Sequence, residues 1–161
     1  MIAPAMLALS AMWLGWTVLV DFFLVPAVFA TIPDFFLAGE MGIQVFSRLN
    51  RLEFPLASIL LALAVLDWRQ RRWPIPVNVA LVGLAGVYLF SLTPKIAELS
   101  GAWAYAERMG TLGAAGAEDV QQLHQQYHRT YVALDTVKLV LLAGQVGFLS
   151  WTLKTRNPHA H

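Results

Sequence analysis

The chain has 161 residues, of which 58% are hydrophobic and only 13% charged, whereas a soluble domain carries about a quarter charged residues. Its mean hydropathy of +0.59 is typical of a membrane protein. The formal net charge of +1 provides no basic field for nucleic acid, and the lack of cysteine excludes disulfides, thiolate metal sites, iron–sulfur clusters and cysteine nucleophiles.

Long apolar stretches predict four transmembrane helices, because roughly 20 mostly apolar residues cross a hydrocarbon core of about 30 Å. We expect the first helix over residues 4–32. Pro26 lies late in it and should kink it, because proline lacks a backbone donor and clashes with the preceding turn. No Lys or Arg precedes this segment, and its apolar stretch is too long for a secretory signal peptide. We therefore expect the helix to be retained.

The second predicted helix begins near residues 38–42 and ends at Trp68, and only its part from Leu52 onward is apolar enough for lipid. Its first half should project beyond the hydrocarbon because it is polar, with Gln44, Arg48, Asn50 and Arg51. A short basic turn over residues 69–74 leads into the third helix, residues 76–93, which Pro94 should stop or bend.

The segment between the third and fourth helices is the least regular. Residues 96–109 are compatible with a short amphipathic helix, and the glycines of residues 110–116 predict a flexible joint. Glu118 and Asp119 suit the first turn of the fourth helix, where acidic side chains complement the helix dipole.

The fold prediction is all-α: a four-transmembrane-helix bundle over residues 1–153, followed by a polar C-terminal tail, residues 154–161. The second and fourth helices should extend beyond the extracytoplasmic surface. Orientation follows from the Lys and Arg residues near the helix ends. Their numbers on the two sides are equal, but they are denser in the turn over residues 69–72. We therefore expect an integral protein of the bacterial inner membrane with both termini cytoplasmic.

Polar residues on the fourth helix recur at steps of four and three, which places them on one face. This polar seam consists of His124, His128, Tyr131, Asp135 and Lys138. At about 1.5 Å per residue it is roughly 20 Å long. Because an ionisable group facing lipid is costly, the seam should turn into the bundle or a wet cavity.

Two other predicted helices carry polar positions that could meet this seam. The first helix contributes Thr17 and Asp21, one turn apart, and the second contributes a stripe with Arg48 and Arg51. We expect these stripes to turn inward as well. The alternative is structural: Asp135 and Lys138 neutralise each other, and the arginines pair with Asp21 or Asp135 to connect helices.

His124 and His128 are spaced i, i+4, so both imidazoles can reach one metal ion. Gln125 stands where zinc proteases carry Glu, which argues against protease chemistry. A copper or zinc site would need a third ligand, for which the sequence offers Met41, Met109, Glu40 and Asp119. Haem ligation by two histidines from different helices is excluded, because the first three helices contain none, but ligation by one histidine, or by histidine and methionine, stays open.

Several short motifs resemble one family. They are Trp13-Leu14-Gly15, the run from Asp21 to Phe29 with Pro33, Leu92-Thr93-Pro94-Lys95-Ile96, and His128 with Thr130 and Asp135. Together they resemble the transmembrane-protein-205-like family, a domain of unknown function that more often has Asn at the position of Asp135. More distantly, the chain is similar to copper-resistance D and HemJ-type membrane proteins. The resemblance implies a four-helix membrane fold. It implies little about chemistry, and the histidine that those relatives carry in their first helix is absent here.

The leading hypothesis is a non-enzymatic protein that binds or transports a small ligand or cation at an outward-facing polar site. That site would be lined by Asp21, Arg48, Arg51, His124, His128, Tyr131, Asp135 and Lys138. In this hypothesis the histidines receive a cation or proton, Asp21 and Asp135 are its anionic partners, and the arginines set the field. Two alternatives are a haem- or quinone-binding redox protein and an accessory subunit of a larger membrane complex. Besides the bilayer, the expected partners are a second copy of the chain or that complex.

Overall fold

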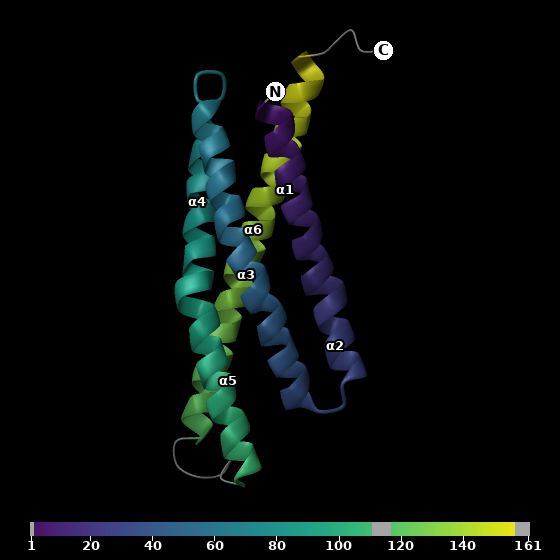
Figure 1. The fold of residues 1–161 in the computed structure, drawn as a ribbon, viewed down its shortest axis with the longest axis vertical. Coiled ribbons are helices and arrows are strands. Elements are labelled where there is room, and N and C mark those ends of the chain that lie inside the picture. The colour runs from purple at the N-terminus through teal and green to yellow at the C-terminus, as the bar shows by residue number, and fades with distance from the viewer. Residues whose placement is uncertain (1, 111–116, 157–161) are drawn as a thin grey trace.

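The computed structural model describes residues 2–110 and 117–156, and every regular element within these ranges is a helix (Figure 1). Four continuous helical segments are long and apolar enough to cross a membrane: Ile2–Thr31, Phe35–Leu66, Pro74–Arg108 and Glu118–Thr155. The predicted all-α bundle of four membrane-spanning helices is therefore confirmed. The end of the predicted polar tail, residues 157–161, lies outside the described residues.

The first and third segments each contain a π-helical turn just before a proline. The first runs through α1 (Ile2–Leu19), η1 (Val20–Leu24) and α2 (Val25–Thr31), with Pro26 as the second residue of α2. At the end of η1 the Val25 N–H bonds to the Val20 carbonyl, five residues back. A proline cannot donate a hydrogen bond, and π-helical turns are a common way in which a helix absorbs such an interruption.

The third segment repeats this arrangement in α4 (Pro74–Val87), η2 (Tyr88–Leu92) and α5 (Thr93–Arg108). Pro94 is the second residue of α5. The helix therefore continues through the proline, and the predicted amphipathic helix over residues 96–109 falls mostly within α5, the C-terminal part of the third segment. The α5 helix ends at Arg108 with Met109 as its C-cap, and the next residue, Gly110, adopts a positive φ of 65° that favours glycine. The predicted joint beyond it, residues 111–116, lies outside the described residues.

The second and fourth segments are single α-helices, α3 (Phe35–Leu66) and α6 (Ala117–Arg156). The α3 helix starts earlier than predicted because the Asp34 side chain accepts hydrogen bonds from the Phe36 and Leu37 N–H groups at 2.9 and 3.1 Å. At 40 residues, α6 is about 60 Å long, roughly twice the thickness of a hydrocarbon core. Part of the bundle must therefore project beyond the membrane.

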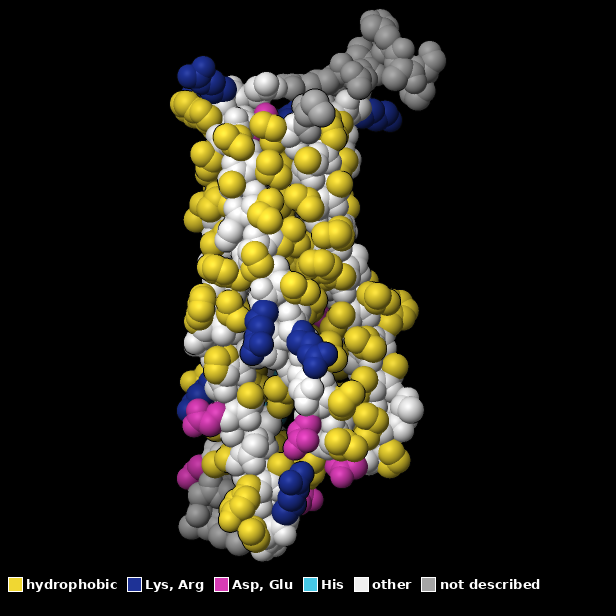
Figure 2. Space-filling model, in the orientation of Figure 1, with side chains coloured by type: hydrophobic (Ala, Val, Ile, Leu, Met, Phe, Trp, Pro, Cys, Tyr) yellow, Lys and Arg dark blue, Asp and Glu magenta, His cyan; other side chains and the backbone are white. Residues whose placement is uncertain are grey.

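The helices pack as neighbouring antiparallel pairs, with α3 beside α4 and with α6 beside both α1 and α5. The start of α1, the end of α6 and the α3–α4 turn lie at one end of the bundle (Figure 1). We call this the terminal end and the opposite one the distal end. The core is densest near the terminal end, where Trp13, Leu60, Leu81 and Leu149 are fully buried. On the face shown in Figure 2, a hydrophobic band covers this half, with basic side chains at both of its borders.

A buried hydrogen-bonded cluster connects three helices within this apolar half. The Gln145 amide of α6 donates to Ser10 Oγ of α1 at 2.8 Å and accepts from Asn78 Nδ2 of α4 at 3.1 Å. All three side chains are fully buried. Because the surroundings offer no water, these polar groups satisfy each other and hold the helices in register.

We predict that Gln145→Leu lowers the free energy of unfolding by about 1–2 kcal/mol, because it breaks two interhelical hydrogen bonds and leaves buried polar groups without partners. The measurement is unfolding of the purified protein in mixed micelles with increasing dodecyl sulfate. Gln126→Leu is the matched control, since Gln126 lies on the same helix with an exposed side chain. Equal stability of the two variants would contradict the prediction.

Candidate functional site

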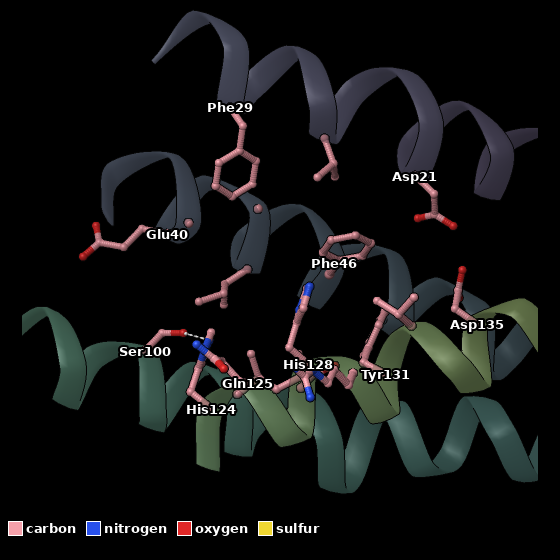
Figure 3. A pocket seen from close by; sticks show the side chains of 18 of the residues that line it. Asp21, Phe29, Glu40, Phe46, Ser100, His124, Gln125, His128, Tyr131 and Asp135 are labelled. Carbon is pink, nitrogen blue, oxygen red and sulfur yellow. Dashed lines mark hydrogen bonds between the residues drawn. The ribbon is translucent and has the colours of Figure 1, made fainter. Parts of the chain in front are cut away.

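A pocket of about 800 Å³ lies between the first segment and helices α3, α5 and α6, in the distal half of the molecule (Figure 3). The pocket exists because the first segment packs on different helices along its length. The α1 helix packs along α6, whereas α2, beyond η1, packs on α3 and makes no contact with the described part of α6. The divergence of α2 from α6 leaves the space that the pocket occupies.

Most of the pocket wall is hydrophobic, and aromatic rings are its main component. The aromatic lining comes from all four segments and consists of Phe22, Phe29, Phe35, Phe36, Phe46, Trp103 and Tyr131. Phe36 and Trp103 meet edge to face with their ring centroids 5.3 Å apart, and Phe46 and Tyr131 meet in the same way at 5.4 Å. Ligand pockets commonly combine such a wall with a few polar groups.

The polar groups of the pocket lie at its two ends. At one end Asp21 of η1 and Asp135 of α6 point toward each other (Figure 3). At the other end are Glu40, Ser100 and the two histidines, with Ser100 Oγ 2.9 Å from Nε2 of His124. Asp21 and four of the five residues of the polar seam thus line one pocket, and their role in binding stays a prediction.

Behind Asp135, away from the pocket, lies a charged link between helices. Lys138 Nζ is 2.6 Å from Asp135 Oδ1 and 2.9 Å from Glu53 Oε1 of α3. The same Glu53 oxygen accepts a hydrogen bond from Trp13 Nε1 of α1 at 2.9 Å. Glu53 is fully buried and Lys138 is only 1% exposed. Three of the four segments are thus joined through one lysine.

The charges around this link do not balance. Lys138 contacts the carboxyl groups of Glu53 and Asp135, whereas Asp21, the third carboxyl group at this end of the pocket, forms no salt bridge within the described residues. Asp21 Oδ2 and Glu53 Oε2 are both buried without a hydrogen-bond partner. Because desolvated like charges repel strongly, this end of the pocket carries an excess of negative charge that favours a proton or a cation.

Uncharged groups close the remaining sides of the link. Lys138 Nζ lies 5.2 Å from the centre of the Tyr88 ring, and Tyr88 packs on Tyr131 with ring centroids 4.8 Å apart. The Tyr131 hydroxyl donates to Asn50 Oδ1 at 3.3 Å, and Asn50 Nδ2 donates to Thr93 Oγ1 at 2.7 Å. These groups separate the link from solvent and add no charge to it.

Six of the eight predicted site residues lie in the pocket wall or directly behind it. Asp21, His124, His128, Tyr131 and Asp135 all line the pocket. Lys138 is buried next to it and paired with two carboxylates, so it supports the wall from behind.

Arg48 and Arg51 correct the prediction, because both are exposed and neither lines the pocket. The face of α3 that turns inward carries Asn50 and Glu53 instead, since these shorter side chains bond to groups on other helices. Glu53 was missed by the sequence analysis. The available signal was its position beside the apolar half of a membrane helix, where an ionisable residue indicates a specific buried partner.

The two histidines stack on one face of α6, with ring planes 7° apart and centroids 6.3 Å apart. The Trp103 ring packs on the His124 ring, with the two ring centroids 5.5 Å apart. Among the described residues, no group of three or more His, Cys, Asp or Glu side chains is arranged to hold a metal ion. Glu40, one of the residues considered as a third metal ligand, forms an exposed ion pair in which its Oε1 lies 3.6 Å from Arg108 Nη2.

Comparison with known proteins places the chain in a family. A family model described as "Domain of unknown function (DUF4149)" matches residues 8–102. The chain belongs to the DUF4149 family. The match covers the first three membrane-spanning segments of this DUF4149 protein almost completely, including Asp21 and Glu53. No curated protein and no solved structure matches the chain. The resemblance to transmembrane-protein-205-like, copper-resistance D and HemJ-type proteins stays a prediction.

We predict that Lys138→Met lowers the free energy of unfolding by about 3–5 kcal/mol, because it leaves Glu53 and Asp135 buried without a counter-ion. Thermal unfolding in mild detergent measures the effect. Lys154→Met, near the end of the same helix at an exposed position, is the control and should change stability little. If both variants are equally stable, the buried link does not hold the bundle together.

Proposed function

We propose that this protein is a membrane-embedded binding protein that takes a small amphipathic organic cation into the pocket from the extracytoplasmic side. One observation carries the proposal: aromatic walls converge on the Asp21–Asp135 pair, whose surroundings hold more carboxyl groups than cationic groups. The pocket lies in the distal half of the bundle, which the distribution of basic residues predicts to be outside.

Electrostatics favours a cation over an anion in this pocket. Arg129 is the one Lys or Arg among the lining residues and its side chain is exposed, whereas Asp21, Glu40 and Asp135 all contribute carboxyl groups. An anion placed near the Asp21–Asp135 pair would meet like charge in a poorly hydrated site. A cation there would supply the counter-charge that Lys138 alone does not provide.

The walls add a preference for a large, weakly hydrated cation. Aromatic rings present a negative face to a cation within about 6 Å, and the gain increases when the cation is already poorly solvated. The volume of about 800 Å³ suits an organic molecule better than a bare metal ion. The described residues offer no group of three metal ligands, which agrees with this choice.

The test compares two probes of nearly identical shape and opposite charge, tetraphenylphosphonium and tetraphenylborate. Equilibrium dialysis against the purified protein in mild detergent, with protein-free micelles subtracted, gives the specific binding of each. We expect saturable binding of the phosphonium at one site per chain and none of the borate. The double variant Asp21→Asn/Asp135→Asn should weaken phosphonium binding by tenfold or more, since one lost ionic contact of about 1.4 kcal/mol corresponds to tenfold in Kd.

Glu98→Gln is the matched control, because Glu98 is an exposed carboxylate paired with Lys95 outside the pocket. It should leave phosphonium binding unchanged. Equal binding of the two probes, or unchanged phosphonium binding in the double aspartate variant, would contradict the proposed function.

A further inference from the structure

We propose that the Asp21–Asp135 pair holds one proton when the pocket is empty and gives it up when a cation enters, so that proton and cation compete for the same end of the pocket. This inference rests on the proposed function and adds its coupling to pH. It starts from two carboxyl groups that point toward each other at one end of the pocket (Figure 3).

The two carboxyl groups are held differently. Asp135 is only 8% exposed, and its Oδ1 lies 2.6 Å from Lys138 Nζ, so this carboxyl already has a cationic partner. Asp21 is half-buried, forms no salt bridge within the described residues, and has one buried oxygen without a hydrogen-bond partner. Asp21 is therefore the member of the pair whose negative charge is the least stabilised.

Two carboxyl groups that point toward each other in a poorly hydrated site are stabilised by a shared proton. An ionised carboxylate only accepts hydrogen bonds, so two carboxylates facing each other repel, whereas one protonated member can donate to the other. The proton then belongs to the pair as a unit.

The groups on the surrounding elements do not take the place of this proton. From α1 the link receives the neutral Trp13 indole, from α3 the Glu53 carboxylate, and from η2 the Tyr88 phenol. From α6 it receives Lys138 and the Tyr131 phenol. Lys138 is already shared between Glu53 and Asp135, and Glu53 adds to the negative charge facing Asp21. One proton on the Asp21–Asp135 pair thus reduces the excess charge by one.

A bound cation performs the same task as that proton. When a permanently charged organic cation enters, the protonated pair loses its proton to solvent and becomes the counter-ion of the ligand. Charge is conserved, because one positive charge leaves as another arrives. Proton and cation binding at this end of the pocket then become mutually exclusive, which is the linkage that exchange of a cation for a proton requires.

The experiment uses tetraphenylphosphonium, which carries a permanent charge and no titratable proton. Proton release is followed with a pH-sensitive dye while the phosphonium is added to the purified protein in weakly buffered detergent solution. We expect about one proton released per phosphonium bound. Raising the pH should strengthen binding by about tenfold per pH unit while the pair is protonated, and the effect should level off once it is ionised.

Two variants identify the source of the proton. Asp21→Asn should bind the phosphonium more weakly and release no proton, because Asp135 alone is kept ionised by Lys138. The double variant His124→Ala/His128→Ala removes the two imidazoles that line the pocket and tests them as the alternative source of the proton, so release should stay at about one proton per bound phosphonium. The inference would be overturned if the double histidine variant released no proton while Asp21→Asn still released one.

Infrared spectroscopy gives an independent check without any ligand. The empty wild-type protein at neutral pH should show the carbonyl band of a protonated carboxylic acid, and Asp21→Asn should remove it. A band that is missing from the wild type, or that persists in Asp21→Asn, would overturn the inference. The two proposals fail differently: no saturable phosphonium binding removes the proposed function, whereas saturable binding that is independent of pH and releases no proton removes only the coupling.

Discussion

The arrangement of this bundle depends on the single ammonium group of Lys138. It contacts Glu53 on α3 and Asp135 on its own helix, and Glu53 in turn accepts a hydrogen bond from Trp13 on α1. Taking these charges out of water is costly, and the cost is offset only if the three helices stand in one relative position. That position places Asp135 at the end of the pocket. Because one lysine cannot balance three carboxyl groups, the stability of the core and the negative character of the pocket have the same origin.

The pocket lies where the first segment exchanges one neighbouring helix for another. The α1 helix packs along α6, whereas from η1 onward the backbone of the first segment no longer packs on the described part of α6, and α2 packs on α3. The combination of a π-helical turn and a proline at η1 and Pro26 recurs at η2 and Pro94, on the opposite side of the pocket.

Much of the fold could be predicted from the sequence, because the length and apolar character of a membrane helix are properties of a single segment. The same applies to the seam on α6, where helical spacing alone places Asp135 and Lys138 on one face. Which helices pack together is harder to predict, because it depends on which faces of two segments meet. The arginines on α3 were assigned inward, yet the inward positions are taken by Asn50 and Glu53, which have hydrogen-bonding partners on other helices. Pro94 was expected to stop or bend a helix, and only the structure shows that a π-helical turn absorbs it.

The π-helical turn at η1 also rotates the side chains that follow it about the helix axis. A π turn contains about one residue more than an α turn, so it acts like a one-residue insertion. Each residue corresponds to about 100° of rotation, and the side chains after the turn are therefore rotated by that angle relative to an uninterrupted helix. This lets α1 direct Ser10 and Trp13 toward its neighbours while α2 directs Phe29 into the pocket. A single periodic pattern could not describe both faces, and removing one residue from η1 would rotate one face out of place even with every other residue unchanged.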